Sequence, residues 1–351
     1  MRFAARLLSP ILAGLMAMGA LPALACTRLV QLGPDGNVFT ARSMDWKEDI
    51  PTNLWILPSG IAREGKAGPN SIRWTARYGS LVATGFDIAT VDGMNEKGLA
   101  ANVLWLTESR YPPIGDKPTL AISLWGQYVL DNFATVAEAV AALETEPFTV
   151  VTADLPDGSR LATLHMAISD PSGDSAVLEY IDGRQVIYHG RQHQVMTNSP
   201  SYDQQLALAS YWREIGGLVF LPGTNRAADR FARAAFYVDA LPRESNPDIA
   251  LASVFSVIRN VSVPYGLNTP DQPYVSSTRW RSVADHKRRL YFFESALTPN
   301  TFWVRLDQID FSAATGRVKK LDLGPNQTHV YSGNATSAFR DSPPFTFMGA
   351  Q

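Results

Sequence analysis

The only cysteine of the chain, Cys26, is the residue best suited to covalent chemistry. It follows directly on Ala23-Leu24-Ala25, a small-x-small sequence typical of signal-peptide cleavage sites. Cleavage after Ala25 would leave a first residue that carries both a thiol and a free α-amine. The thiolate is the reactive form of cysteine, and an α-amine with a pKa of about 8 can accept the thiol proton. The sequence therefore predicts a nucleophile and its base within one residue.

Two charged residues are expected to lie beside this cysteine. Residues 26–44 contain two strand-like stretches around a Gly-Pro-Asp-Gly turn, which predicts a β-hairpin. In an antiparallel hairpin the end of the second strand returns to the start of the first, and this brings Arg42 and Asp45 towards Cys26. Asp45 would then orient the amine and Arg42 would stabilise the thiolate. An ordinary surface ion pair is the alternative interpretation of Arg42 and Asp45.

Cys26 itself has two other interpretations. A lone cysteine is often a buried structural residue. The sequence Leu24-Ala25-Cys26 also partly matches the processing site of bacterial lipoproteins, although the leucine usually stands one place earlier, where this chain has Ala23. The second alternative would make the chain a lipid-anchored binding protein whose amine is blocked.

The first 25 residues are predicted to be a signal peptide rather than part of the fold. Arg2 and Arg6 form a positive segment, and an apolar run at 7–21 follows it. Ser9, Pro10 and Gly14 interrupt this run, so it is a poor membrane-spanning helix. No later segment is long enough to cross a bilayer. We therefore predict export to the periplasm or the medium, without membrane insertion after cleavage.

The composition excludes several classes of partner. A formal net charge of −2 disfavours nucleic acid, because nucleic-acid binders usually carry a basic excess. The five histidines show no metal-ligand spacing, and no glycine-rich phosphate loop follows a strand. We predict no metal and no cofactor, and a small-molecule substrate. The basic run at 286–289 is interpreted as a solvated turn between strands.

The pattern of segments predicts an α+β protein with antiparallel sheets. Strand-like segments occur in three blocks, within 54–106, 161–198 and 276–323, with a polar turn at 92–99. Helical spacing occurs at 119–134, 136–143, 202–212, 227–241 and 247–258. The helices and strands do not alternate as βαβ units. Because no linker or repeat is visible, residues 26–351 are predicted to form a single domain.

Five short motifs, in order along the chain, carry a resemblance to a known family. They are C-T-R at 26–28, A-R-S-M-D-W at 41–46, D-G-M-N-E-K-G-L at 92–99, V-M-T-N-S-P-S-Y-D at 195–203 and A-D-R-F-A-R at 228–233. Together they resemble the choloylglycine hydrolase family, which includes bile salt hydrolases and penicillin V acylases. The resemblance implies a four-layer αββα sandwich of the N-terminal-nucleophile hydrolases, in which two antiparallel sheets lie between helix layers.

The resemblance also implies a role for each matching residue. Cys26 matches the nucleophile, and its amine matches the proton acceptor. Arg42 matches the arginine beside the thiol, and Asp45 matches the carboxylate that binds the amine. Asn198 matches the side-chain donor of the oxyanion hole, and Arg230 matches a second arginine near the nucleophile. Without the resemblance, Asn198 would be interpreted as a turn residue and Arg230 as a solvated helix charge.

Two features differ from the bile salt hydrolases of the family. Those enzymes carry an asparagine whose backbone N–H completes the oxyanion hole, and this chain has Trp105 there. The backbone N–H donor is retained in Trp105. Trp105 and Trp46 would also place two aromatic side chains near the nucleophile, where they are expected to bind substrate. Core packing is the alternative interpretation of each tryptophan. The segment between Asn198 and Arg230 is also shorter than the one that assists tetramer formation in those enzymes, although the resemblance still implies a homotetramer.

In these differences and in its export signal, the chain is similar to the Gram-negative members of the family. The implied activity is hydrolysis of a linear amide by a cysteine nucleophile. The implied substrates are phenoxymethylpenicillin-like amides or N-acyl homoserine lactones, since an aromatic-lined pocket suits an apolar acyl group. Hydrolysis of conjugated bile salts is the alternative within the enzyme class, and a lipid-anchored, non-catalytic binding protein is the alternative from another class.

Overall fold

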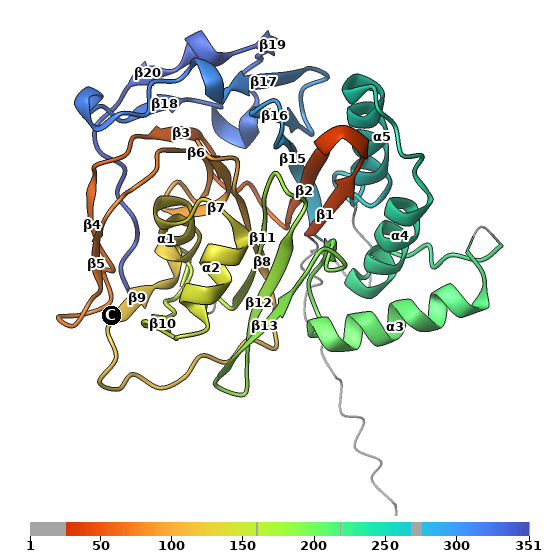
Figure 1. Cartoon of the computed structure of the whole chain (residues 1–351), viewed down its shortest axis with the longest axis horizontal. Coiled ribbons are helices and arrows are strands. Elements are labelled where there is room, and N and C mark those ends of the chain that lie inside the picture. The colour runs from red at the N-terminus through yellow and green to blue at the C-terminus, as the bar shows by residue number, and fades with distance from the viewer. Residues whose placement is uncertain (1–25, 159–160, 218, 268–275, 351) are drawn as a thin grey trace, which may run out of the picture.

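Two large β-sheets pack face to face, and helices cover the outer side of each sheet (Figure 1). The structure is a computed structural model that describes residues 26–158, 161–217, 219–267 and 276–350. The predicted signal peptide, residues 1–25, lies outside the described residues. The arrangement is α+β with antiparallel sheets, in the four-layer αββα order that the resemblance implies.

The first sheet contains the N-terminal hairpin and has seven strands. All neighbouring pairs are antiparallel except the last, β17 with β19, which is parallel. In spatial order the strands are β14 (Val195–Met196), β1 (Thr27–Leu32), β2 (Val38–Trp46), β15 (Ser277–Asp285), β16 (Leu290–Ser295), β17 (Thr301–Arg305) and β19 (Gly333–Asn334). The predicted hairpin is therefore confirmed as β1 and β2, near the centre of this sheet.

The second sheet has nine strands, and all of its pairs are antiparallel. In spatial order they are β13 (Arg184–His189), β12 (Ser175–Ile181), β11 (Leu164–Ser169), β8 (Ala100–Trp105), β7 (Ala89–Asn95), β6 (Ser80–Gly85), β3 (Leu54–Leu57), β18 (Lys319–Leu321) and β20 (Arg340–Asp341). Two further pairs lie outside the sheets: antiparallel β4 (Ala62–Glu64) with β5 (Arg73–Thr75), and parallel β9 (Thr119–Ala121) with β10 (Thr149–Val151).

Five α-helices of the described residues form the outer layers. The helices α1 (Trp125–Asn132) and α2 (Val136–Leu143) pack on the nine-stranded sheet. The helices α4 (Ala227–Ala240) and α5 (Pro247–Asn260) pack on the seven-stranded sheet, and α3 (Tyr202–Ile215) packs on α4. Short 3-10 helices are η1 (Pro34–Gly36), η2 (Ile122–Leu124), η3 (Leu306–Gln308), η4 (Ala313–Thr315), η5 (Pro325–Gln327) and η6 (Thr336–Ala338). No helix in the described ranges combines the length and apolar character needed to span a bilayer.

Three local expectations were wrong, each because tertiary contacts override the local pattern. The predicted helix at 119–134 begins as the strand β9, and α1 starts only at Trp125. The predicted polar turn at 92–99 starts as strand, since β7 continues to Asn95 and the Asp92 carboxylate is buried between the sheets. The run at 286–289 does form the turn between β15 and β16, but His286 is fully buried rather than solvated.

Candidate active site

The β1–β2 hairpin brings Cys26 next to Asp45, as the sequence predicts. Thr27 pairs with Ser43 and Arg28 pairs with Arg42, so Cys26, one residue before β1, lies beside the end of β2. The Cys26 Sγ donates a hydrogen bond of 3.8 Å to the backbone oxygen of Asp45, and only 3% of the cysteine is exposed. The nucleophile that the sequence predicts is therefore buried at the start of a central strand.

Two residues from distant parts of the chain hold the main chain of Cys26. Its N–H donates to Oδ1 of Asn198, and its carbonyl oxygen accepts a 2.6 Å hydrogen bond from Nη1 of Arg230. Nη2 of Arg230 also donates to Oδ1 of Asn198, at 3.1 Å. The three predicted residues thus form one connected group.

The sheet and a helix explain why these residues meet. The strand β14 pairs with β1 through Met196 and Arg28, so Asn198, two residues beyond β14, lies next to Cys26. The helix α4 packs across β1, and Arg230 in its first turns is fully buried, with Nε donating to the backbone oxygen of Asn225 at 3.0 Å. Burial lowers the pKa of Arg230, while the negative charges of Asp45 and Cys26 oppose this shift.

Arg42 supplies a second positive charge at the site. Its guanidinium stacks on the Trp280 ring, with Cζ 4.6 Å from the ring centroid, and Nη2 donates to the backbone oxygen of Val103 at 3.2 Å. Its Nε and Nη1 are buried and have no hydrogen-bond partner among the described residues. Arg42 lines the same cavity as Cys26, so these donors belong to the walls of the site.

Asp45, whose backbone oxygen accepts from the thiol, is fully buried. Its Oδ1 accepts a 2.5 Å hydrogen bond from Thr278 Oγ1, and its Oδ2 accepts a 3.2 Å hydrogen bond from Ser43 Oγ. Burial raises the pKa of Asp45 to about 6, although Arg230 and Thr278 act in the opposite direction. In the full-length chain the nitrogen of Cys26 is a peptide amide that donates to Asn198. The role of Asp45 in orienting a free amine therefore stays a prediction for the mature chain.

The two predicted oxyanion residues are neighbours. The Asn198 side-chain amide donates to the backbone oxygen of Trp105 at 2.7 Å, and Trp105 is the last residue of β8. An amide NH₂ group carries two hydrogens, so this contact uses only one of the donors of Asn198. The geometry places both predicted oxyanion residues beside the nucleophile.

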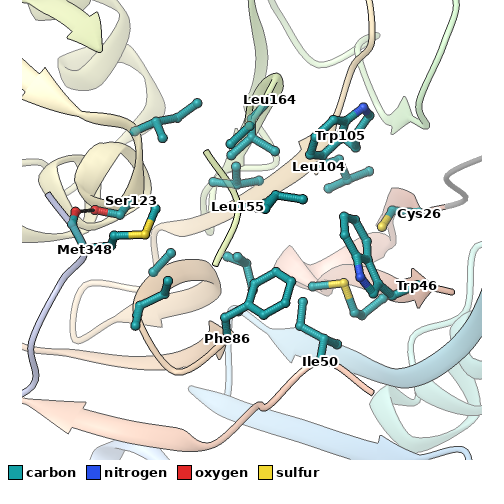
Figure 2. A pocket seen from close by; sticks show the side chains of 18 of the residues that line it. Cys26, Trp46, Ile50, Phe86, Leu104, Trp105, Ser123, Leu155, Leu164 and Met348 are labelled. Atoms are coloured by element: carbon teal, nitrogen blue, oxygen red, sulfur yellow. Dashed lines mark hydrogen bonds between the residues drawn. The ribbon is translucent and has the colours of Figure 1, made fainter. Parts of the chain in front are cut away.

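An apolar cavity extends from Cys26 into the protein (Figure 2). The Trp46 and Trp105 rings lie beside Cys26 with their centroids 5.8 Å apart, and the Phe86 ring meets Trp46 edge-on at 5.9 Å. Apart from these rings the walls are almost entirely aliphatic, from Ile50, Val91, Val103, Leu104, Ile122, Leu155 and Leu164. Both predicted tryptophans thus line the cavity, while they also pack into the core.

Some residues of this site carry no recognisable signal in the sequence. Phe86 belongs to the β6–β7 turn and reaches the cavity with a backbone φ of 53°, which a phenylalanine rarely adopts. Met348 lines the cavity from the C-terminal segment. Thr278 contacts Asp45 from the neighbouring strand β15, where the two residues are paired. In the described ranges no group of three or more His, Cys, Asp or Glu residues converges as a metal site would require.

The comparison with protein families decides the class of this site. Residues 26–320 match the family described as linear amide C–N hydrolases, choloylglycine hydrolase family. The chain belongs to the choloylglycine hydrolase family. It is therefore an amide hydrolase with the N-terminal-nucleophile hydrolase fold, and the resemblance carried by the five motifs is confirmed.

Several relatives of this family member are known. Over 356 aligned residues, the chain is 54% identical to a penicillin V acylase of Pectobacterium atrosepticum, covering 95% of each protein. The structure of a penicillin V acylase from Agrobacterium tumefaciens superimposes with a TM-score of 0.87 and 63% identity, covering 92% of this chain and 100% of that one. A conjugated bile acid hydrolase from Clostridium perfringens has a TM-score of 0.72 over 85% of this chain and 97% of that one, but only 23% identity, so this likeness supports the fold alone.

Proposed function

We propose that this family member hydrolyses amides with an apolar acyl group, namely phenoxymethylpenicillin and N-acyl homoserine lactones, with Cys26 as the nucleophile. The observation that carries the proposal is the apolar cavity that begins at the Cys26 thiol and is bordered there by Trp46, Trp105 and Phe86. Aromatic side chains offer a large apolar contact area at a small cost in conformational entropy. The similarity to penicillin V acylases supports the same substrate class.

The reaction begins once residues 1–25 have been removed. The α-amine of Cys26 accepts the thiol proton, and the thiolate attacks the acyl carbonyl carbon to form a C–S bond. The negative charge that develops on the carbonyl oxygen is stabilised by the Asn198 side-chain amide and the Trp105 backbone N–H, and such a donor typically contributes about 3 kcal/mol to the transition state. The amine then protonates the leaving nitrogen as the C–N bond breaks.

A water molecule completes the cycle. The amine takes a proton from this water, the resulting hydroxide attacks the thioester carbonyl, and the C–S bond breaks to release the carboxylic acid. Arg42 favours the thiolate electrostatically, since opposite charges lower a thiol pKa. Arg230 positions both the Cys26 carbonyl and the Asn198 side chain. We assign to Asp45 the role of holding the free amine in the mature chain.

The test compares three substrates on the mature enzyme that begins at Cys26. We expect hydrolysis of penicillin V and of N-acyl homoserine lactones, with glycocholate hydrolysed much more slowly. The Cys26→Ala variant is expected to lower kcat/KM by about 10³-fold or more, while its thermal unfolding stays close to that of the wild type. Hydrolysis by Cys26→Ala at the wild-type rate would refute the mechanism, and a preference for glycocholate would favour bile salt hydrolysis.

We also propose that the protein is exported and cleaved between Ala25 and Cys26. The support is the small-x-small sequence at Ala23-Leu24-Ala25 after a positive and then an apolar segment. Intact mass and N-terminal sequencing of protein purified from the periplasm should give a chain that starts at unmodified Cys26. A lipidated cysteine or another start would remove the base and contradict the proposed mechanism.

A further inference from the structure

We propose that Met348, near the C-terminus, closes the far end of the acyl cavity and thereby limits the length of the acyl chain that the enzyme accepts. The inference rests on the proposed function, because it assigns the cavity to the acyl group. It adds a residue that determines specificity and that belongs to none of the five motifs.

The cavity has two distinct ends in Figure 2. Cys26, Trp46 and Trp105 lie at one end, where the acyl carbonyl must sit to be attacked. Ser123 and Met348 lie at the opposite end. The thioether of Met348 points from that end into the cavity. A linear acyl chain that extends away from Cys26 would therefore end against Met348.

The segment that carries Met348 is anchored to the protein through its main chain. The Met348 N–H donates to the Ile88 oxygen at 3.0 Å, and the Met348 oxygen accepts a 2.5 Å hydrogen bond from Ser123 Oγ. On either side, Nζ of Lys66 donates to the Phe347 oxygen at 3.0 Å and the Ala350 N–H donates to the Lys66 oxygen at 2.8 Å. These contacts hold the backbone, so the Met348 side chain can be replaced without releasing the segment.

Neighbouring side chains strengthen this anchor. Phe347 and Ala350 are buried, with 4% and 2% exposed, and Phe345 stacks edge-on against both Trp55 and Phe347. The C-terminal segment is thus part of the wall of the cavity. Methionine has an unbranched, flexible side chain, so Met348 can adjust to chains of slightly different length but still blocks longer ones.

Binding of the product acids tests the inference without catalysis. Linear fatty acids from butanoate to dodecanoate are titrated into the mature wild-type enzyme by calorimetry, since these acids are not turned over. Each buried methylene should strengthen binding by about fourfold, until the chain reaches Met348 and the gain stops. In Met348→Ala we expect this limit to move to acids about three carbons longer, because three side-chain atoms beyond Cβ are removed. In Met348→Phe it should move to shorter acids.

The exposed Val330, which is outside the cavity, provides a matched control. Val330→Ala should leave the length limit at the wild-type value. An unchanged limit in both Met348 variants, or the absence of binding by every acid, would overturn the inference. Hydrolysis of penicillin V by the wild type is measured separately, so a failure of the proposed function is recognised independently.

Discussion

The Cys26 thiol is surrounded by charges that act on its pKa in opposite directions. Burial is the largest effect and raises the pKa of the thiol. The positive charges of Arg42 and Arg230 lower it, and the negative charge of Asp45 raises it. A thiolate at this position therefore depends on the arginines, because burial alone would keep the thiol protonated.

This balance predicts opposite effects for two single substitutions. Arg42→Gln should raise the apparent pKa of Cys26, because it removes a nearby positive charge, and Asp45→Asn should lower it, because it removes a negative one. The measurement is the rate of alkylation of the mature protein by iodoacetamide as a function of pH. Arg305→Gln removes an exposed charge far from the site and should have no effect. Shifts in the same direction for Arg42→Gln and Asp45→Asn would contradict the assigned balance.

From the pattern of strands and turns, the residues near Cys26 could be predicted only where the sequence places them on connected elements. Arg42 and Asp45 were predicted because one hairpin joins them to Cys26. Thr278, which donates to Asp45, comes from β15, and nothing in the sequence fixes the pairing of β15 with β2. Asn198 and Arg230 were assigned through the family motifs, since a sequence alone does not reveal that a strand end and a helix start converge.

At the scale of elements, the β6–β7 turn presents Phe86 to the cavity in an unfavourable backbone conformation. Phe86 and Asp87 have φ values of 53° and 54°, a region that costs non-glycine residues free energy. The Asp87 carboxylate anchors the turn by accepting hydrogen bonds from Trp55 Nε1 at 2.7 Å, Thr84 Oγ1 at 2.9 Å and Lys320 Nζ at 2.9 Å. Burial alone would raise the pKa of Asp87, but these hydrogen bonds have the larger combined effect and lower it.

Loss of this anchor should affect both stability and substrate binding. We expect Asp87→Ala to lower the free energy of unfolding by about 1–3 kcal/mol, because its buried donors lose their acceptor, and to raise KM several-fold as Phe86 shifts. Urea unfolding and steady-state kinetics with penicillin V measure the two effects. Asp182→Ala is the matched control, since Asp182 is an exposed turn residue with a φ of 51° between β12 and β13. Equal effects of both variants on KM would mean that the anchor does not position Phe86.

The elements themselves were predictable to different degrees. The helix at 136–143 was predicted with the observed bounds, since it has a local pattern that its packing reinforces. Residues 119–121 have helical spacing but form β9, because they pair with β10 and their buried side chains join the core. The position of Met348 could not be predicted, since it depends on contacts with Ile88 and Ser123 from distant segments.

At the scale of the whole molecule, buried polar groups join the two sheets. His286, just after β15, shares a 2.7 Å hydrogen bond with Thr40 Oγ1, and its Nδ1 lies 2.7 Å from the Gly98 oxygen, to which it donates. Thr40 Oγ1 lies 2.7 Å from Ser169 Oγ on the other sheet. Burial lowers the pKa of His286 to about 4. The imidazole is therefore neutral at the interface between the sheets.

This buried histidine should destabilise the protein in acid. Its folded pKa of about 4 is below the ordinary 6.5, so the unfolded chain binds more protons between these values. The stability that His286 contributes is present above about pH 6.5 and is lost as the pH falls towards 4, by about 3 kcal/mol in total. His286→Gln should flatten the dependence of the unfolding free energy on pH in this window. His329→Gln, which changes a half-exposed histidine, should leave this pH dependence unchanged. A curve for His286→Gln as steep as that of the wild type would contradict the role assigned to His286.

The start of the mature chain should decide whether the assembled site is active. The sheets, α4 and the C-terminal segment arrange the site around Cys26, but a peptide nitrogen is not basic and cannot accept the thiol proton. We expect a mature chain with one extra glycine before Cys26 to lose penicillin V hydrolysis by about 10³-fold or more, because the amine is then displaced from the thiol. Its Cys26 should still be alkylated by iodoacetamide, and removal of the glycine by an aminopeptidase should restore the activity. Full activity of the extended chain would show that another group serves as the base, and the buried carboxylate of Asp45 would be the first residue to replace.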